Sequence, residues 1–596
     1  MRGREIIKPA SGMHRWIASA LLLAAFVAPV RADNKTGAES IAVAPTVSAP
    51  TDKETAAQHD ARMAWWREAK FGLFIHWGVY AVPAGKYGNI TDSDAWIMYL
   101  AKIPVQDYRA FSVQFNPVKY NPELWTKIAK NAGMRYIVIT AKHHDGFALY
   151  PSKVSDWNIT DASPYKKDLL GPLVNAAHRD GLKIGFYYSQ AQDWVHRGGA
   201  KGGRIFKYEE GGGWDDAQKG SFDDYLKNIA VPQVREILTG YPIDILWWDT
   251  PKWMNAQRAA PLAALTTLRP GLITNNRLGP GFAGDTSTPE QFIPVLGYRG
   301  DWETCMTMND HWGYNALDTN WKSSADLIRK LAETCSKGGN LLLNVGPTAE
   351  GEFPQPCVER LQEVGRWLKI NSDSIYGTHA GPFFNLSWGC ATRKDNRLYL
   401  HVFKWPLTGQ LLVPLQSEAK AAWLLTSPDT PLKITREPNR LAISVPNTAP
   451  DPTDTVVVLE LNGEPAAVPL PTVGASATAT GSDPNSAPEN ILDGTDKKYW
   501  LAPKDVKSAS VEIDLVQDTA IAGFGFDEPG FRRRMSQTFT LEAMENKRWI
   551  KIAEGKTEGF GFKGYFQTII ARKFRITMTS EEGIPALAEV QLYRPE

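Results

Sequence analysis

Three carboxylic side chains stand where they could hydrolyse a glycosidic bond. That reaction needs two carboxyl groups, one to attack the anomeric carbon and one to protonate the leaving oxygen. Asp249 directly follows the apolar run of residues 243–248, which would place it at a strand end among aromatic neighbours that exclude water. A structural aspartate that caps the next helix is the alternative. Glu290 and Glu303 lie in the following stretch and are the candidates for the proton donor.

Three histidines, His76, His143 and His144, would bind zinc if neighbouring strand ends presented them together. A zinc site is disfavoured, because adjacent residues of an extended segment point to opposite sides, and the sequence lacks the His-x-His and His-Glu-x-x-His spacings. Neutral imidazoles that bind hydroxyl groups are the favoured interpretation. No metal and no organic cofactor are expected.

Strands and helices that alternate along the chain must position these residues. Apolar runs at residues 136–140, 183–188 and 243–248 are separated by helical stretches at residues 170–180 and 222–239. Continuous apolar strands between helices indicate a parallel sheet covered on both faces. A (β/α)8 barrel of the TIM type is predicted rather than a doubly wound open sheet, because polar and aromatic residues directly follow each strand.

After Tyr376 the pattern changes to alternating β runs. The runs at residues 397–403 and 455–461 predict antiparallel strands of a small β-sandwich. A stretch rich in Pro, Ala, Thr and Gly at residues 464–481 predicts a linker. The β runs beyond it resemble the discoidin-like β-sandwich of carbohydrate-binding modules, an independent unit whose removal we expect to spare turnover of a small substrate.

The charge balance bears on the kind of ligand. Lys plus Arg (66) nearly equals Asp plus Glu (65), so the chain lacks the positive field that a nucleic-acid-binding protein needs. The 21 Trp and 20 Tyr residues provide flat faces that stack on sugar rings and also fill cores. A neutral carbohydrate partner is therefore favoured, and no nucleic acid is expected.

The N-terminus has the pattern of a secretory signal peptide. Basic residues precede the apolar run of residues 16–30, and a small-residue cleavage site ends at Ala32. The run is shorter than the ~20 residues that span a bilayer, and no second candidate follows, so no membrane span is expected in the mature chain. We predict cleavage after Ala32 and a secreted or periplasmic protein; an uncleaved anchor is the alternative.

Long sequence strings occur in a fixed order between about Met63 and Tyr376, roughly half of the chain. They are WREAKFGLFIHWG at residues 66–78, KHHDGF at residues 142–147, WETCM at residues 302–306, WGYN at residues 312–315 and GGNLLLNVGP at residues 338–347. Together they resemble glycoside hydrolase family 29, the α-L-fucosidases. The resemblance implies a retaining, exo-acting hydrolase of terminal α-L-fucose without a cofactor, whose partners are fucosylated oligosaccharides or glycoconjugates.

The resemblance also implies roles for individual residues. WWD at residues 247–249 matches the W-x-D motif of the nucleophile, Asp249. Glu290 aligns with the loop carboxylate that serves as acid/base in several members, and Glu303 is the other candidate. Glu290 is favoured, because a loop carboxylate beside proline can swing over the leaving group, whereas Glu303 would be buried and bind sugar hydroxyls or Arg277. The substrate-binding residues implied are His76, Trp96, His143, His144, Tyr188, Trp247, Arg277 and Trp312.

Trp96 and Trp312 resemble the apolar wall against which the methyl group of fucose lies, although each could equally be a core tryptophan. The chain departs from the family at Ala95, where relatives commonly have glutamate. That departure puts in doubt the usual contacts at the outer rim of the fucose pocket.

These patterns combine into one prediction of the domain organisation and its function. The expected parts are a signal peptide (1–32), a linker (33–58), a catalytic barrel (59–378), a β-sandwich (379–466), a second linker (467–481) and a discoidin-like carbohydrate-binding module (482–596). Two other functions stay open: a catalytically weak carbohydrate-binding protein, and a retaining hydrolase of α-L-galactosides. The oligomeric state does not follow from the sequence.

Overall fold

The computed structural model describes residues 54–203, 205–383, 386–494, 498–530, 535–557, 559–581 and 583–595. The predicted signal peptide and most of the first linker lie outside these residues. The first helix, α1 (Ala56–Ala69), begins inside the range predicted as that linker. Among the residues described, none of the helices combines the length and the apolar character that a bilayer crossing requires.

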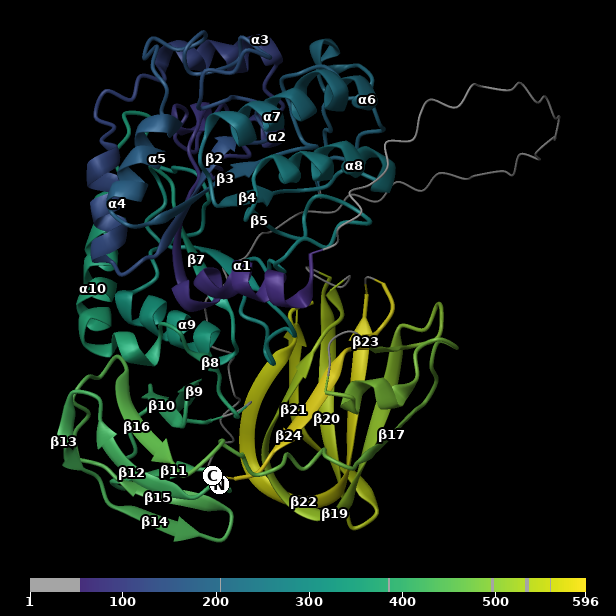
Figure 1. Cartoon of the computed structure of the whole chain (residues 1–596). Helices are drawn as coiled ribbons and strands as arrows, with labels where there is room; N and C mark the ends of the chain where they lie inside the picture. The colour runs from purple at the N-terminus through teal and green to yellow at the C-terminus, as the bar shows by residue number, and fades with distance from the viewer. Residues whose placement is uncertain are drawn as a thin grey trace, which may run out of the picture. The chain divides into compact units, whose positions relative to one another are not determined.

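Seven parallel strands form one sheet, in the order β5-β4-β3-β2-β1-β7-β6 (Figure 1). The strands predicted from the apolar runs are confirmed as β2, β3 and β4. The full set is β1 (Phe71–Ile75), β2 (Tyr136–Lys142), β3 (Lys183–Tyr188), β4 (Ile245–Trp248), β5 (Ile273–Thr274), β6 (Glu303–Thr307) and β7 (Asn340–Val345).

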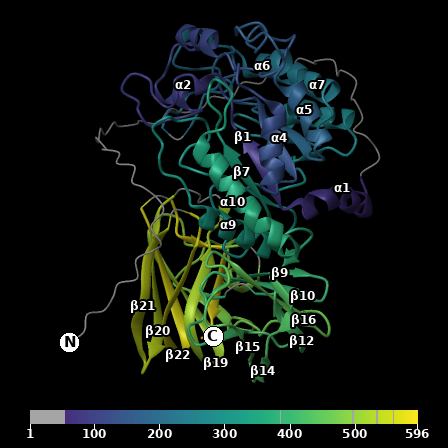
Figure 2. The same cartoon turned by 90° about the vertical axis from the view of Figure 1, so that its left-hand side faces the viewer.

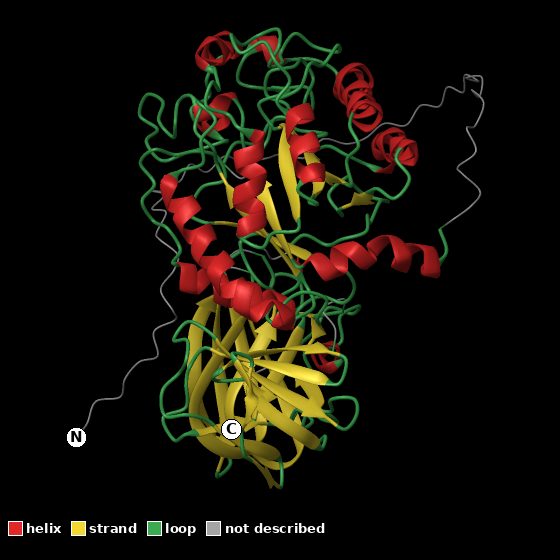
Figure 3. Ribbon diagram, turned by 60° about the vertical axis from the view of Figure 1, so that its left-hand side comes forward, coloured by secondary structure: helices red, strands yellow, loops and turns green. Residues whose placement is uncertain are grey.

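Helices connect most of these strands, as the red and yellow ribbons of Figure 3 show. Side chains cap several of them at the N-terminus, as when Asn121 accepts from the Leu124 N–H (2.9 Å). The longer helices are α4 (Pro122–Asn131), α5 (Leu170–Arg179), α7 (Val231–Gly240), α8 (Ala256–Leu265), α9 (Ser324–Ser336) and α10 (Gln355–Asn371). Short helices are α2 (Ile97–Leu100), α3 (Val105–Arg109) and α6 (Phe222–Tyr225).

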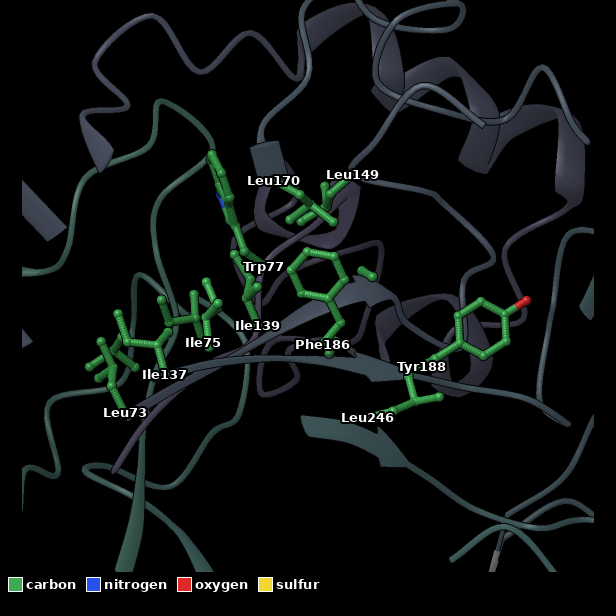
Figure 4. Close-up of a cluster of buried hydrophobic side chains, with 14 of the residues drawn as sticks. Leu73, Ile75, Trp77, Ile137, Ile139, Leu149, Leu170, Phe186, Tyr188 and Leu246 are labelled. Atoms are coloured by element: carbon green, nitrogen blue, oxygen red, sulfur yellow. The ribbon is translucent and has the colours of Figure 1, made fainter. Parts of the chain in front are cut away.

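The two faces of the sheet have separate cores. On the outer face, alternate residues such as Ile75, Ile139 and Phe186 pack against the helical layer, including Leu170 of α5 (Figure 4). On the other face, one cluster draws side chains from all seven strands: Phe74, Tyr136, Val138, Tyr187, Ile245, Trp247, Ile273, Cys305 and Leu342. Strands of a flat sheet this wide could not all reach one cluster, so the sheet curls into a parallel half-barrel.

Helix α1 closes the end at which the strands begin. Its Met63 and Trp66 belong to the inner cluster, and the carbonyl of Trp66 accepts from Asn340 Nδ2 (2.7 Å) at the first residue of β7. The helix thus covers the inner core from below, opposite the end where polar side chains leave the strands.

An extended segment, residues 285–291, links the two outer strands of the sheet. On one side the Asn276 N–H donates to the Thr286 carbonyl (2.9 Å), in line with β5. On the other side the Glu303 N–H donates to the Ser287 carbonyl (2.9 Å), and parallel bridges pair Ser287 with Trp302 and Glu290 with Cys305. Backbone pairing therefore continues from β5 to β6 through this segment.

The region after residue 376 is built from antiparallel sheets. The strands predicted at residues 397–403 and 455–461 are confirmed as β10 and β16, which pair with each other. One sheet has the order β13-β12-β16-β10-β9-β8 and a smaller one β11-β15-β14, and both contribute to one core. The strands are β8 (His379–Ala380), β9 (Gly389–Lys394), β10 (Arg397–Val402), β11 (Gln410–Val413), β12 (Ala419–Leu424), β13 (Ser427–Pro431), β14 (Ile434–Glu437), β15 (Arg440–Ser444) and β16 (Thr455–Leu461).

The last region has its own sheet and its own core, and Figure 2 shows its long strands side by side. Strand β17 (Ser476–Ala479) pairs with β19, so part of the segment predicted as the second linker is a strand. The other strands are β18 (Trp500–Leu501), β19 (Ser508–Asp527), β20 (Gln537–Glu545), β21 (Arg548–Thr557), β22 (Phe562–Ser580), β23 (Ala586–Leu587) and β24 (Glu589–Tyr593).

Candidate active site

Arg277 joins two of the predicted carboxylates. Its Nη1 atom donates to Asp249 Oδ1 at 2.8 Å and to Glu290 Oε2 at 2.9 Å. The guanidinium is fixed from another side, because Nε donates to the Thr288 hydroxyl (2.8 Å) and Nη2 to the Thr288 carbonyl (3.0 Å). It also lies over the ring of Trp247, 4.7 Å from the centroid. Because both carboxylate oxygens accept hydrogen bonds from the same nitrogen, Asp249 Oδ1 and Glu290 Oε2 are less than about 6 Å apart.

The surrounding charges set the ionisation of Asp249. Burial alone would raise the pKa of Asp249, but the Arg277 guanidinium and the Tyr187 hydroxyl outweigh it and hold that pKa below its ordinary value. The side chains of Asp249, Arg277 and Glu290 are 12, 17 and 29% exposed. Asp249 is therefore an anion at neutral pH, and Glu290 is the carboxylate that solvent reaches more easily.

The residue after each of these carboxylates has a left-handed backbone. Thr250 has φ 44° and Gln291 has φ 65°, a region that residues other than glycine rarely adopt and that persists only where neighbours hold it. The Gln291 side chain supplies such a hold. Its Oε1 accepts from the Thr307 N–H (3.1 Å) and its Nε2 donates to the Thr307 hydroxyl (3.0 Å). The chain thus turns sharply just beyond Asp249 and Glu290.

Tyr187, and not Tyr188, is the tyrosine of this site. The Tyr187 hydroxyl donates to Asp249 Oδ2 at 2.7 Å, and its ring stacks on Trp247 with centroids 5.6 Å apart. The Tyr188 hydroxyl instead donates to Gln233 Oε1 (2.9 Å), and Figure 4 shows this side chain on the outer face of the sheet. The expectation that Tyr188 binds substrate is corrected, because adjacent residues of a strand face opposite sides.

The histidines are held by neighbouring polar side chains. His76 Nδ1 lies 2.7 Å from Asn344 Oδ1, and His144 Nδ1 lies 2.7 Å from Ser189 Oγ. The other ring nitrogen of His144, Nε2, is 3.5 Å from Asp249 Oδ2. The expectation that adjacent histidines point to opposite sides is wrong here, since the two neighbouring rings in the KHHDGF string have centroids 4.2 Å apart. Strand β2 ends just before them, so they do not follow strand alternation.

Burial keeps these imidazoles neutral. It lowers the pKa of His144 to about 4, and it also lowers the pKa values of His76 and His143. Within the described part of the chain, His143 Nδ1 is a buried polar atom without a hydrogen-bond partner. An unsatisfied buried group costs about 1–3 kcal/mol, so this atom favours a ligand that carries hydrogen-bonding groups.

Trp312 and Trp96 flank the histidines from two sides. The Trp312 ring lies 5.0 Å from that of His76, and the Trp96 ring lies 5.1 Å from that of His144. Asp94 holds both tryptophans, because its carboxylate accepts from the Trp312 N–H at 2.6 Å and the Trp96 N–H at 3.2 Å. Its oxygens therefore serve the backbone and do not replace the glutamate that is missing at the next position.

Glu303 lies apart from the other two carboxylates. It is 2% exposed, and it accepts from the Tyr136 hydroxyl (2.5 Å) and from Trp247 Nε1 (3.1 Å). Tyr136 is the first residue of β2, so Glu303 sits inside the curled sheet near the end that α1 covers. Burial raises the pKa of Glu303 to about 7. It does not bond Arg277, as one expectation had it, and accepts from Tyr136 and Trp247 instead.

Several polar residues of the site were not expected from the sequence, among them Tyr187, Asn344 and Asp94. The two-residue period of β3 places Tyr187 and Tyr188 on opposite faces of the sheet, but it does not reveal which face is the inner one. Asn344 lies in the GGNLLLNVGP string, where an amide inside an apolar strand marks a buried hydrogen bond. No spacing in the sequence connects Asp94 with Trp312, which lies 218 residues away.

Family comparisons divide the chain in two. The family described as Alpha-L-fucosidase matches residues 39–373, and the F5/8 type C domain matches residues 475–590. The chain is 32% identical to an α-L-fucosidase of Branchiostoma floridae over 393 residues, 61% of this chain and 84% of the relative. It is 32% identical to the human plasma α-L-fucosidase over 388 residues, 59% of this chain and 79% of that enzyme.

Solved structures of α-L-fucosidases match about two thirds of the chain. An α-L-fucosidase isoenzyme from Paenibacillus thiaminolyticus has 36% identity and a TM-score of 0.61, covering 68% of this chain and 99% of that one. A GH29 α-L-fucosidase from Bacteroides thetaiotaomicron has 28% identity and a TM-score of 0.61, covering 68% of this chain and 95% of that one. A further structure from that organism, 29% identical with a TM-score of 0.60 over 68% of this chain and 97% of that one, is of a trapped covalent intermediate with 2-fluoro-fucosyl fluoride. On these grounds the chain belongs to the α-L-fucosidase family, glycoside hydrolase family 29, and is a glycoside hydrolase with an F5/8 type C domain near its C-terminus.

Proposed function

We propose that this protein is a retaining, exo-acting α-L-fucosidase that removes terminal α-L-fucose from glycans, with Asp249 as nucleophile and Glu290 as acid/base. The observation that carries the proposal is the single nitrogen of Arg277 that contacts both carboxylates. Their spacing supports retention, since the carboxyl groups lie about 5–5.5 Å apart in retaining enzymes and at least ~6.5 Å apart in inverting ones.

In the first step, an oxygen of Asp249 bonds to the anomeric carbon of fucose while the bond to the leaving oxygen breaks and the proton of Glu290 moves to that oxygen. In the second step, the Glu290 carboxylate takes a proton from water. The water oxygen then attacks the anomeric carbon and releases Asp249. Arg277 and Tyr187 stabilise the Asp249 carboxylate before attack and after release.

Neutral histidines and tryptophans supply the sugar site of this proposal. His76, His143 and His144 would exchange hydrogen bonds with the ring hydroxyls, and the unpartnered Nδ1 of His143 supports a hydroxyl-bearing ligand. Trp96 and Trp312 would form the apolar wall for the methyl group of fucose. An enzyme that tolerates a hydroxyl at that position would also hydrolyse α-L-galactosides.

The finer architecture also belongs to this proposal. The segment of residues 285–291 would be the remaining strand of a closed (β/α)8 barrel, since it pairs with neighbours on both sides. The antiparallel sheets of the two later regions would pack as β-sandwiches. The N-terminal pattern supports export from the cytoplasm.

The stereochemistry of the product tests the proposal. Hydrolysis of 4-nitrophenyl α-L-fucoside followed by proton NMR should give α-L-fucose first, which then mutarotates. Initial release of β-L-fucose would exclude the double displacement. The same enzyme assayed on 4-nitrophenyl α-L-galactoside separates a fucosidase from a galactosidase. Binding of fucosylated glycans without turnover of either substrate would indicate a binding protein instead.

A further inference from the structure

One sector of the parallel sheet has no helix of its own. Consecutive strands elsewhere in the sheet are joined through α4, α5, α7, α8 and α9. Every residue between β5 and β6 is described, and none of them is helical. This stretch carries both Arg277 and Glu290, so a helical layer does not support the two side chains that contact Asp249.

The C-terminal domain packs on this stretch instead. The carboxylate of Asp527, at the end of β19, accepts from the Val295 N–H (3.2 Å) and from the Leu296 N–H (3.3 Å). Nearby, Arg299 Nη2 donates to the Gly494 carbonyl (3.1 Å). Asp527 is 8% exposed, so its contacts with the loop are shielded from solvent and are stronger than those of a surface pair.

An aromatic pair forms the second contact. The rings of Phe292 and Phe560 have centroids 4.7 Å apart. Phe560 lies between two glycines with positive φ, Gly559 (82°) and Gly561 (80°), a geometry that glycine adopts without strain. Glu528 fixes this turn by accepting from the Gly561 N–H (2.9 Å). The turn therefore presents Phe560 toward the loop of the catalytic region.

These contacts lie next to Glu290. Gln291, with its left-handed backbone, separates Glu290 from Phe292. The Thr304 hydroxyl holds the Phe292 carbonyl (2.7 Å) from the side of β6, and Phe560 holds the Phe292 ring from the other side. A strained turn keeps its geometry only when both of its flanks are fixed.

We propose that Asp527 and Phe560 of the C-terminal domain are positioning residues for Glu290. They hold the loop of residues 291–299 in place, and the loop holds the carboxyl group at the leaving oxygen. The inference rests on the proposed role of Glu290 as acid/base. It gives the F5/8 type C domain a part in catalysis in addition to any binding of glycans.

The test uses leaving groups that need different amounts of protonation. Wild type, Asp527→Ala, Phe560→Ala and Glu290→Ala of the full chain are assayed on 2-chloro-4-nitrophenyl and phenyl α-L-fucosides and on a fucosylated oligosaccharide. A displaced acid should slow hydrolysis of the phenyl fucoside about tenfold while the activated fucoside changes less than about twofold in the first step. Asp527→Asn keeps one acceptor oxygen and should restore the ratio of the two rates to within about twofold of wild type.

The control is Asp514→Ala, on the same strand β19. Asp514 pairs with Arg572 and Lys573 inside the C-terminal domain, so its loss perturbs that domain without touching the loop. Its ratio of rates should equal that of wild type. Thermal unfolding of each variant identifies loss of fold, and Asp527→Asn keeps the test decisive if Asp527→Ala unfolds.

Two outcomes overturn the inference. One is an unchanged ratio in folded Asp527→Ala and Phe560→Ala. The other is a raised KM for fucosylated oligosaccharides alone. A pocket of about 250 Å³, lined by Thr288, Asp527 and Phe560, lies between the loop and the C-terminal domain, and this outcome would identify it as a sugar subsite. Glu290→Ala tests the proposed function separately from this inference. If the ratio of the two rates does not change in Glu290→Ala, the assignment of Glu290 as acid/base fails, whatever the result for the Asp527 variants.

Discussion

The two ends of the inner core of the sheet place the same chemical group in opposite settings. At the strand ends, Glu290 shares the cation of Arg277 with Asp249 and is reached by solvent. Near the strand starts, Glu303 is enclosed by Tyr136 and Trp247 without a cation in contact. Trp247 separates the two, because its ring faces Arg277 while its indole N–H faces Glu303.

The difference shows how environment divides tasks between carboxylates. Glu290 lies beside a guanidinium and within reach of solvent, where it can exchange protons with substrate and water. A carboxylate buried against aromatic rings is driven toward its neutral form, and burial raises the pKa of Glu303 to about 7. Glu303 is thus part of the folded core, and Glu290 is the carboxylate to which we assign the proposed chemistry.

The largest effect expected is that of Asp249→Ala. Without this carboxylate no glycosyl-enzyme can form, so kcat on an aryl fucoside should fall by about 10⁴-fold or more. Asp244→Ala is the matched control, because Asp244 precedes the same strand and contacts Lys183 at the opposite end. Substantial activity in Asp249→Ala would assign the nucleophile to another residue.

Glu290→Ala should cause the second largest loss of activity, and this loss should depend on the leaving group. Hydrolysis of poorly activated fucosides should fall by about 10²–10⁴-fold, since the leaving oxygen receives no proton. Added azide should restore turnover and give β-fucosyl azide, which NMR identifies. If azide rescued Glu303→Ala with this product and did not rescue Glu290→Ala, Glu303 and not Glu290 would be the acid/base.

Tyr187→Phe and Tyr188→Phe test the corrected tyrosine. Loss of the hydrogen bond to Asp249 should lower kcat/KM about tenfold. It should also move the acidic limb of the pH profile upward, because one of the groups that hold the pKa of Asp249 down is removed. Tyr188→Phe should leave kcat/KM and the acidic limb of the pH profile unchanged and should lower only Tm. Equal kinetic effects of the two variants would contradict the assignment.

The smallest kinetic effect is expected for Glu303→Gln, whose rate should stay within about threefold of wild type. Its effect is on stability. The pKa of Glu303 in the folded state, about 7, lies above that of the unfolded chain. The folded protein therefore holds this proton more tightly, and stability from this group is present at acidic pH and lost as pH rises through 7.

Glutamine cannot ionise, so the variant should match wild type near pH 5 and exceed it near pH 8 by about 1–3 kcal/mol. Chemical denaturation at both values measures the difference. A variant that is less stable than wild type at pH 8 would show that ionised Glu303 is stabilised by its two donors.

The sequence predicts the regular half of the sheet and not the sector that carries Glu290. Strands β2, β3 and β4 are continuous apolar runs, and helices separate them, so their pattern is unambiguous. β5 has only two residues, and residues 285–291 contain polar residues and a proline, so no periodicity marks them as extended. Their conformation depends on contacts made on both sides.

The site residues likewise divide into those that a sequence pattern indicates and those that depend on the completed fold. Asp249 is predicted from its position after an apolar strand, and Arg277 and Glu290 from the family resemblance. The structure brings the three side chains together, and their catalytic roles stay predictions. The choice of Tyr188 over Tyr187 failed, because a strand that is apolar on both faces does not reveal which face is the inner one. The pairing of Asp94 with Trp312 depends on the completed fold, since no local pattern joins residues so far apart.

The contact between Asp527 and Val295 spans 232 positions of the chain, and this separation has a consequence for biosynthesis. The ribosome adds about 5–20 residues per second, so roughly 10–50 s pass between the emergence of the loop beside Glu290 and that of the residue that secures it. In the mechanism proposed above, Asp249 emerges before the domain that holds the loop beside Glu290. A nascent chain of the proposed enzyme therefore completes the surroundings of Asp249 first and the support of Glu290 last, when translation is nearly complete.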